Sequence, residues 1–279
     1  MKYKIVIDSC CELPEELKGR EEFESAPLTL NVNGEEIVDD ATFDQASFLR
    51  KVAASPKCPK SACPSPDYYK RAYECGAEHI YAITLSAELS GSYNSAVLGM
   101  NLYREKHPDA KIHVFNSRSA SVGETLIALK IRELEESGMD FAELVETVET
   151  YIDGQHTYFT LENLDTLRKN GRLSTVKAFA ASVLKIKPVM GSTPEGTIQQ
   201  LDQARGINKA LLKMVDHIVN EAADSEEKVL GISCCNCRER AEMVRDAIRE
   251  RMTVKDVIIL DTAGVSSMYA NDGGIIVVI

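Results

Sequence analysis

The sequence lacks a long hydrophobic run, a secretory leader and an excess of positive charge, and each absence excludes a class of protein. No apolar run reaches the roughly 20 residues of a membrane-spanning helix. The short apolar start stops at Asp8 without the features of a signal peptide, so we expect a cytoplasmic protein. The net charge is −11, from 32 basic and 43 acidic residues. This balance argues against binding to nucleic acid or to an anionic membrane face.

Common catalytic motifs are also missing. The chain contains no Gly-x-Ser-x-Gly elbow, no Gly-x-x-x-x-Gly-Lys phosphate loop and no Gly-x-Gly-x-x-Gly fingerprint. Asp8-Ser9 could supply a nucleophile and an orienting acid, but none of the five histidines falls where a base is needed. Asp8 could instead bind magnesium as in a phosphatase, although no second acidic residue follows a neighbouring predicted strand. The sequence therefore offers a binding site more readily than a catalytic one.

Eight cysteines are spaced irregularly along the chain, which indicates reduced and mostly buried thiols rather than a disulfide framework. Cys234-Cys235-Asn236-Cys237 could bind a soft metal. However, no histidine lies close to it in sequence and no second cysteine pair has a zinc-ribbon spacing. We therefore predict no metal site.

Alternation of apolar strands with amphipathic helices predicts an α/β fold. Strands over 4–7, 80–85 and 112–115 are separated by predicted helices, which implies βαβ units and a mainly parallel sheet. Asn33-Gly34 between two short strands is a hairpin signal. Thr42 with Gln45 resembles a capping box for a helix that ends at Ala54, and 55–66 is predicted to be a loop.

The second half of the chain changes character, which suggests a second domain. Helices are expected over 161–169, after Ser174, and over 207–222 and 238–251, with strands at 187–190, 197–201, 229–233, 257–260 and 273–279. Asp153-Gly154-Gln155 is a plausible linker. We therefore predict an N-terminal α/β domain over 1–155 and a smaller α/β domain over 156–279.

A serine-rich loop, residues 86–96, connects a predicted buried strand to a predicted helix. Backbone N–H groups and the helix dipole at such a junction suit a carboxylate or a phosphate. Asp8-Ser9 and Asn116-Ser117 follow the two other strands, so we expect all three segments at one edge of the sheet. Ser90 can donate to an anion or serve as a plain N-cap. Gly91 would let a ligand approach the backbone closely.

Three further polar residues are ambiguous. Arg172, after Gly171, could steer an anion or lie on the surface after a helix cap. Arg205 is more simply explained as a surface residue. Tyr269 begins the turn-like residues 269–274 and could be a core aromatic or a hydrogen-bond donor to a ligand.

Several segments, in order along the chain, resemble motifs of the DegV family of fatty-acid-binding proteins. Residues 85–96 are similar to its Leu-Ser-Ser-x-Leu-Ser-Gly-Thr-Tyr-x-Ser-Ala signature, and residues 60–65 resemble its Lys-Thr-Ser-Gln-Pro-Ser loop. The other similar segments are Asp8-Ser9, residues 164–174 (Leu-x-x-Leu-x-x-Gly-Gly-Arg-x-Ser), residues 184–189 (Leu-x-Ile-Lys-Pro-Ile) and Arg205-Gly206.

The resemblance implies a two-domain lipid carrier without catalysis or a cofactor of its own. A long-chain fatty acid would lie in an apolar tunnel, its carboxylate held by Ser61 and Ser90, and a separate ATP-dependent fatty acid kinase would receive it. Gly91, Ser92, Arg172 and Tyr269 complete the expected ligand site. Tyr269 stands where many members have histidine, and Ser61 stands where they have threonine. The alternatives are a phosphatase or kinase-related enzyme that uses the same anion site, and a lipid-responsive regulatory protein.

Overall fold

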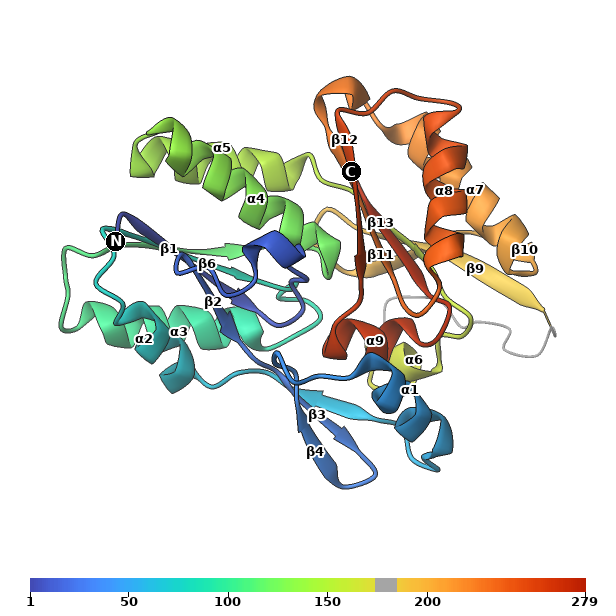
Figure 1. Cartoon of the computed structure of the whole chain (residues 1–279), viewed down its shortest axis with the longest axis horizontal. Coiled ribbons are helices and arrows are strands. Elements are labelled where there is room, and N and C mark those ends of the chain that lie inside the picture. Colours follow the sequence, from blue (N-terminus) through green and yellow to red (C-terminus); the bar gives the residue numbers. More distant parts are fainter. Residues whose placement is uncertain (174–184) are drawn as a thin grey trace.

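A four-stranded parallel sheet forms one half of the molecule, as the sequence predicts (Figure 1). The computed structural model describes residues 1–173 and 185–279. The strands stand in the order β2-β1-β6-β7, and all neighbouring pairs are parallel. They are β1 (Tyr3–Asp8), β2 (Phe23–Ala26), β6 (His79–Thr84) and β7 (Lys111–Asn116). The carboxyl ends of β1, β6 and β7 therefore lie side by side.

Two pairs of helices cover the faces of this sheet (Figure 1). Ile80 and Ala82 of β6 pack with α2 (Pro66–Tyr73) and α3 (Ser92–Arg104). Tyr81 and Ile83 point to the opposite face, toward α4 (Val122–Ser137) and α5 (Phe141–Asp153). Because both faces are covered, β6 is buried along its whole length, which explains its continuous apolar run.

A six-stranded mixed sheet forms the other half, in the order β10-β9-β8-β13-β11-β12. The helices α7 (Ile207–Glu221) and α8 (Arg238–Arg249) pack on one face, and α4 packs on the other. Val122 and Leu126 of α4 contact Val278. The strands are β8 (Thr157–Thr160), β9 (Ile186–Ser192), β10 (Ile198–Arg205), β11 (Val229–Cys234), β12 (Asp256–Asp261) and β13 (Ile275–Val278). Since α4 lies between two sheets, its first turns are buried on every side, Glu124 and Thr125 included.

A small antiparallel sheet completes the fold, in the order β4-β3-β5, with β3 (Thr29–Val32), β4 (Glu35–Val38) and β5 (Lys60–Ala62). The predicted hairpin is confirmed, because Asn33 and Gly34 both have positive φ, as its two-residue turn requires. The expected loop over 55–66 is wrong in part, since β5 pairs with β3 within it.

The capping box at Thr42 is also wrong. The N-cap of α1 (Gln45–Ala54) is Asp44, whose carboxylate accepts a hydrogen bond from the Ser47 backbone N–H at 2.7 Å. The Thr42 hydroxyl instead donates to Asp40. A carboxylate next to the helix start satisfies the orphan N–H groups better than a residue two positions earlier.

Three other elements differ from expectation. The helix over 161–169 is only α6 (Asp165–Lys169), because β8 and the turn that follows it occupy the preceding residues. The predicted turn over 269–274 is wrong at its start, because Tyr269 and Ala270 belong to α9 (Gly264–Ala270). The helix after the serine-rich loop begins at Ser92, earlier than predicted. Two short 3-10 helices are η1 (Glu15–Leu17) and η2 (Ser225–Glu227), and the helix expected after Ser174 lies outside the described residues.

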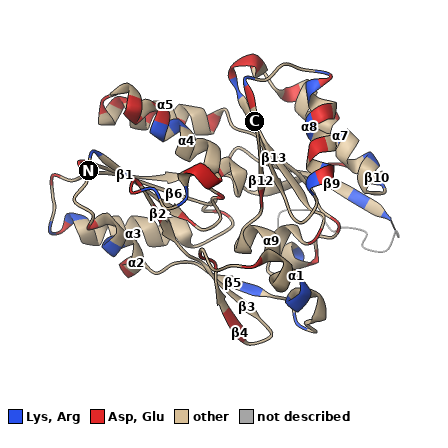
Figure 2. Cartoon of the chain, in the orientation of Figure 1, with Lys and Arg blue, Asp and Glu red and all other residues tan. Residues whose placement is uncertain are grey.

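The division into domains at 155/156 stays a prediction. Strands of the parallel and three-stranded sheets come from residues 3–116, and those of the six-stranded sheet from 157–278. Acidic side chains are spread over both halves, with basic ones between them (Figure 2). Within 1–173 and 185–279, no helix is long and apolar enough to cross a membrane.

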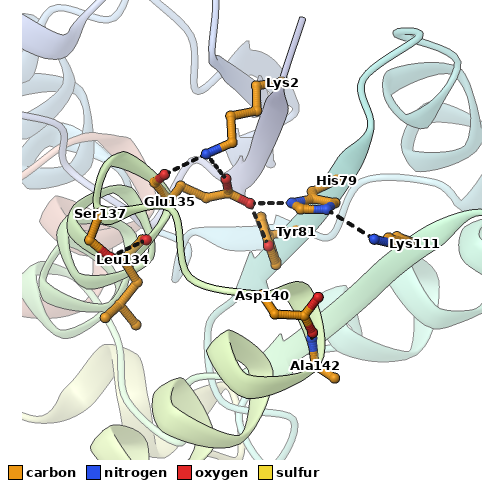
Figure 3. A network of polar contacts seen from close by, with 9 residues as sticks. All are labelled: Lys2, His79, Tyr81, Lys111, Leu134, Glu135, Ser137, Asp140 and Ala142. Atoms are coloured by element: carbon orange, nitrogen blue, oxygen red, sulfur yellow. Dashed lines mark hydrogen bonds and ion pairs between the residues drawn. The ribbon is translucent and has the colours of Figure 1, made fainter.

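An ion-pair network around the buried Glu135 ties the amino-terminal edge of the parallel sheet to α4 (Figure 3). The Glu135 carboxylate is 2.6 Å from His79 Nδ1 and 2.7 Å from the Tyr81 hydroxyl. Lys2 Nζ approaches the same carboxylate at 3.4 Å and also donates to the Glu135 carbonyl. These contacts stabilise the end of the sheet opposite to the serine-rich loop.

Candidate functional site

A cavity, open at its mouth, lies between the small sheet and the six-stranded sheet. Its walls come from two apolar clusters, one around β3 and α9 and one around β8, β9 and α6. The apolar side chains of the lining are Leu28, Leu85, Leu89, Ala120, Phe159, Leu161, Leu167, Ile198, Val265, Ala270 and Ile276.

Ser90 lines this cavity from the serine-rich loop. The loop begins with a turn in which Leu89 N–H and Ser90 N–H both donate to the Ser86 carbonyl. The Ser90 Oγ accepts from the Ser92 backbone N–H at 3.2 Å, while Gly91 occupies the N-cap. Ser90 therefore lines the cavity while its hydroxyl accepts from the first turn of α3, so the two sequence interpretations are compatible.

Ser61 reaches the same cavity from β5, and Tyr269 reaches it from α9. Their hydroxyl oxygens lie 3.3 Å apart. Ser61 is placed by the pairing of β5 with β3, where it stands opposite Leu30. Two segments more than 200 residues apart in sequence thus present neighbouring hydroxyls to one space.

Arg172 also lines the cavity, next to Tyr269. Its Nε donates to the Leu89 carbonyl at 3.1 Å, and its Nη1 donates to the Asn170 carbonyl at 2.6 Å. The guanidinium carbon lies 5.6 Å from the centre of the Tyr269 ring, a cation–π contact. The guanidinium thus adds positive charge beside the hydroxyls of Ser61 and Tyr269.

Two predicted site residues do not line the cavity. Gly91 is exposed, and a Cβ there would lie 3.1 Å from Cys63 Sγ. Ser92 is fully buried in the first turn of α3, with its Oγ 3.1 Å from the Ser90 Oγ. Their contribution is to support Ser90 rather than to face the cavity. Arg205 and the histidines are likewise absent from the described lining.

Asp39 holds the helix that carries Tyr269. Its carboxylate accepts from Gly264 N–H at 2.7 Å, from Val265 N–H at 2.8 Å and from the Ser9 hydroxyl at 2.9 Å. This caps α9 from the other half of the chain, and burial raises the pKa of Asp39 to about 6. Sequence reasoning missed both Asp39 and α9, because the cap is supplied from a distant segment instead of from the preceding residues.

Asp8 is not a cavity residue, although it follows a strand as predicted. It is fully buried, and its two oxygens accept from the backbone N–H groups of Cys10 and Leu85, both at 3.0 Å. It therefore anchors the start of the serine-rich loop, and burial raises the pKa of Asp8 to about 6. The second acidic residue beside it is Glu124, which comes from α4 and not from a strand end. The sequence search, restricted to strand ends, could not find it.

Comparison with known proteins identifies the family. A family model described as uncharacterised proteins of the DegV family matches residues 2–279. The chain belongs to the DegV family. A DegV domain-containing protein of Streptococcus pneumoniae is 37% identical over 279 residues, which cover 99% of this chain and 98% of that protein.

Solved DegV structures share the whole fold. A DegV family protein of Ruminococcus gnavus, refined with vaccenic acid, has 55% identity and a TM-score of 0.97, with 100% of this chain and 99% of that chain covered. The fatty acid kinase (Fak) B3 protein of S. pneumoniae, loaded with linoleic acid, has 36% identity and a TM-score of 0.88, with the same coverage. The predicted family and α/β fold class are thus confirmed.

Proposed function

We propose that this DegV protein is a cytoplasmic carrier that binds a long-chain fatty acid in the cavity described above. The carboxylate would lie at the end formed by Ser61, Ser90, Tyr269 and Arg172, and the acyl tail would follow the apolar walls. The observation that carries this proposal is that three hydroxyls and the Arg172 guanidinium line the same, mostly apolar cavity, with Ser61 and Arg172 both close to Tyr269. Binding of this kind needs no cofactor.

The energetics assign different roles to the two ends. A hydrogen bond to a charged group contributes about 1.5–3 kcal/mol, and each buried methylene about 0.8 kcal/mol. A tail of about a dozen methylenes would then contribute more than the hydroxyl contacts together. The polar end would therefore select a carboxylate and set its direction, while the walls would supply most of the affinity.

The carrier would present its ligand to a separate ATP-dependent fatty acid kinase and catalyse nothing itself. Support comes from its similarity to a protein named as the B3 component of a fatty acid kinase. A phosphatase that uses Asp8 receives no support from the geometry, because Asp8 is buried and both of its oxygens hold backbone N–H groups. A lipid-responsive regulatory role would use the same cavity, and no contact in the described residues favours it.

Native mass spectrometry of the purified protein tests the binding step. We expect a co-purified acyl chain, and saturable binding of a C18 fatty acid after delipidation. Ser61→Ala and Ser90→Ala should each weaken binding about 10- to 150-fold, the equivalent of one charge-assisted hydrogen bond. Ser95→Ala is the matched control, because Ser95 lies in α3 but outside the lining and its hydroxyl faces Cys63. Delipidated protein that takes up no fatty acid would overturn the proposal.

The absence of catalysis is tested separately. Lipid-loaded protein mixed with labelled ATP alone should form no acyl phosphate, while addition of a fatty acid kinase should produce it. Turnover with ATP alone would refute the carrier role and leave the binding site intact. A fall in melting temperature of Ser90→Ala that is the same with and without lipid would show that Ser90 acts only as a helix cap.

A further inference from the structure

Two serine hydroxyls lead from the cavity wall to a buried carboxylate. Ser90 lines the cavity, and its Oγ lies 3.1 Å from the Ser92 Oγ. The fully buried Ser92 hydrogen-bonds in turn with the side chain of Asp8, at the end of β1. Ser90, Ser92 and Asp8 thus connect the cavity with an acid in the core, and we call these three side chains the Ser90–Asp8 relay.

A fatty carboxylate bound at Ser90 would add a third hydrogen bond to this relay, which holds only two protons of its own. The three bonds would join the ligand to Ser90, Ser90 to Ser92, and Ser92 to Asp8, and each needs one proton between its two oxygens. The two serine hydroxyls supply one proton each. With the ligand and Asp8 both ionised, lone pairs would therefore face each other at one of the three positions, which leaves a buried hydrogen bond unmade.

The side chains that face Asp8 do not supply the missing proton. One side-chain atom each of Asp8, Cys10 and Glu124 lies within 4.8 Å of the other two. Burial raises the pKa of Glu124 well above its usual range, so Glu124 is protonated, and its hydrogen bond to Asp8 already uses that proton. Burial also raises the pKa of Cys10 and of Tyr69 in α2 well above their usual values, so both stay neutral. The hydrogen bonds that most affect Asp8 include none from a basic side chain.

Given the fatty acid binding proposed above, we propose that the Ser90–Asp8 relay takes up one proton when a fatty carboxylate binds. In the empty protein, both serine protons point inward, from Ser90 to Ser92 and from Ser92 to the ionised Asp8. In the complex, one proton from solvent resides on Asp8, and both serine protons point outward, so that Ser90 donates to the ligand. Only the bond between Ser92 and Asp8 reverses, and the backbone N–H groups of Cys10 and Leu85 keep Asp8 as their acceptor.

Asp8 is a positioning residue in this arrangement, because it acts on the ligand through the two serines. Burial is the largest influence on Asp8 and raises its pKa to about 6, against hydrogen bonds that lower it. A bound carboxylate places a second negative charge at the other end of the relay, which raises the pKa of Asp8 further in the complex. Binding is therefore strongest where Asp8 is protonated, and it weakens as the pH rises above about 6.

Equilibrium dialysis with radiolabelled dodecanoic acid and dodecanol, from pH 6 to pH 8, tests the proton uptake in delipidated protein. The alcohol brings its own proton and completes all three hydrogen bonds without uptake. We expect the Kd of the acid to rise about 5- to 50-fold over this range and that of the alcohol to change less than about twofold. The alcohol also corrects for Glu12 and Asp39, which hold α9 and whose pKa values burial raises to about 7 and about 6.

Ser92→Ala interrupts the relay and should remove at least half of the pH dependence of the acid. Ser95→Ala is the matched control in α3, because its hydroxyl faces Cys63, and it should keep the whole dependence. Full pH dependence in Ser92→Ala would refute the relay, because the proton would then go to a group outside it.

The comparison of acid with alcohol in the parent protein decides the proposal even if Ser92→Ala does not fold. Equal pH profiles for the two ligands would overturn the proton uptake and leave the carrier function intact. Failure of the acid to bind at any pH would overturn the carrier function itself, and the proton uptake with it.

Discussion

Replacement of Tyr269 by phenylalanine tests how the polar end of the cavity holds a carboxylate. The Tyr269 hydroxyl lies 3.3 Å from the Ser61 hydroxyl, and the ring lies 5.6 Å from the Arg172 guanidinium carbon. Phenylalanine keeps the ring and its packing, so only one hydroxyl is lost. If that hydroxyl donates to the carboxylate, its loss costs about 1.5–3 kcal/mol and raises Kd about 10- to 150-fold. If it serves Ser61 alone, a neutral hydrogen bond is lost and Kd rises about 2- to 13-fold.

The assay is displacement of a fluorescent fatty acid from delipidated protein, with Tyr269→Phe, Ser61→Ala and the double variant side by side. Tyr68→Phe is the matched control, because its hydroxyl donates to the Ser25 carbonyl at 2.9 Å, outside the cavity. We expect the 10- to 150-fold rise in Kd for Tyr269→Phe and no change in Kd for Tyr68→Phe. Because the two hydroxyls lie 3.3 Å apart and would share one carboxylate, the losses in the double variant should not be additive. A Kd for Tyr269→Phe within twofold of the parent refutes a direct contact.

Three further predictions concern the scaffold. Gly99→Ala should lower the free energy of unfolding, measured in urea, by about 1–2 kcal/mol. The new Cβ would lie 2.7 Å from the Pro66 carbonyl, and this overpacking outweighs the better helix propensity of alanine. An unchanged urea midpoint would contradict the α2–α3 packing. Glu135→Gln should lower the free energy of unfolding by about 1–3 kcal/mol, because His79 loses its charged acceptor. An unchanged free energy of unfolding would mean that the contacts of Glu135 only offset the cost of burying its charge. Asp39 has its pKa raised by burial to about 6, so its stabilising contribution is complete below about pH 4 and is lost as pH rises through 6. From pH 4 to pH 7, the free energy of unfolding of Asp39→Asn should therefore rise by up to about 3 kcal/mol relative to that of the parent, as measured by urea titration. Parallel pH curves for the two proteins would rule this out.

The parallel sheet could be predicted from sequence because its pattern is local. Strands β1, β6 and β7 are apolar runs that end in polar residues, and helical patterns separate them. By contrast, β8 is only four residues long and becomes a strand through its pairing with β9 and β13. The helix α9 contains one glycine and two serines and depends on its cap from Asp39. Elements stabilised by distant partners leave little trace in their own sequence.

The candidate site divides in the same way. Recognisable sequence segments contain the four predicted residues that line the cavity, which are Ser61, Ser90, Arg172 and Tyr269. Their place in one cavity follows only from the tertiary structure. Gly91 and Ser92 belong to the same motif, but the first turn of α3 directs them away from the cavity. No spacing rule connects Asp8 in β1 with a residue of α4, so the acidic pair follows only from the tertiary structure.

The position of β13 has a consequence for synthesis. It comes after all the other strands in the chain, yet it lies between β8 and β11 inside the six-stranded sheet and pairs with both. As the chain leaves the ribosome, β8 and β11 must wait with unpaired edges until residues 275–278 emerge. Exposed edges of this kind invite pairing with other chains. Newly made copies should therefore be most prone to aggregation until residues 275–278 have emerged, and loss of these few residues should leave a sheet split in two rather than a shortened one.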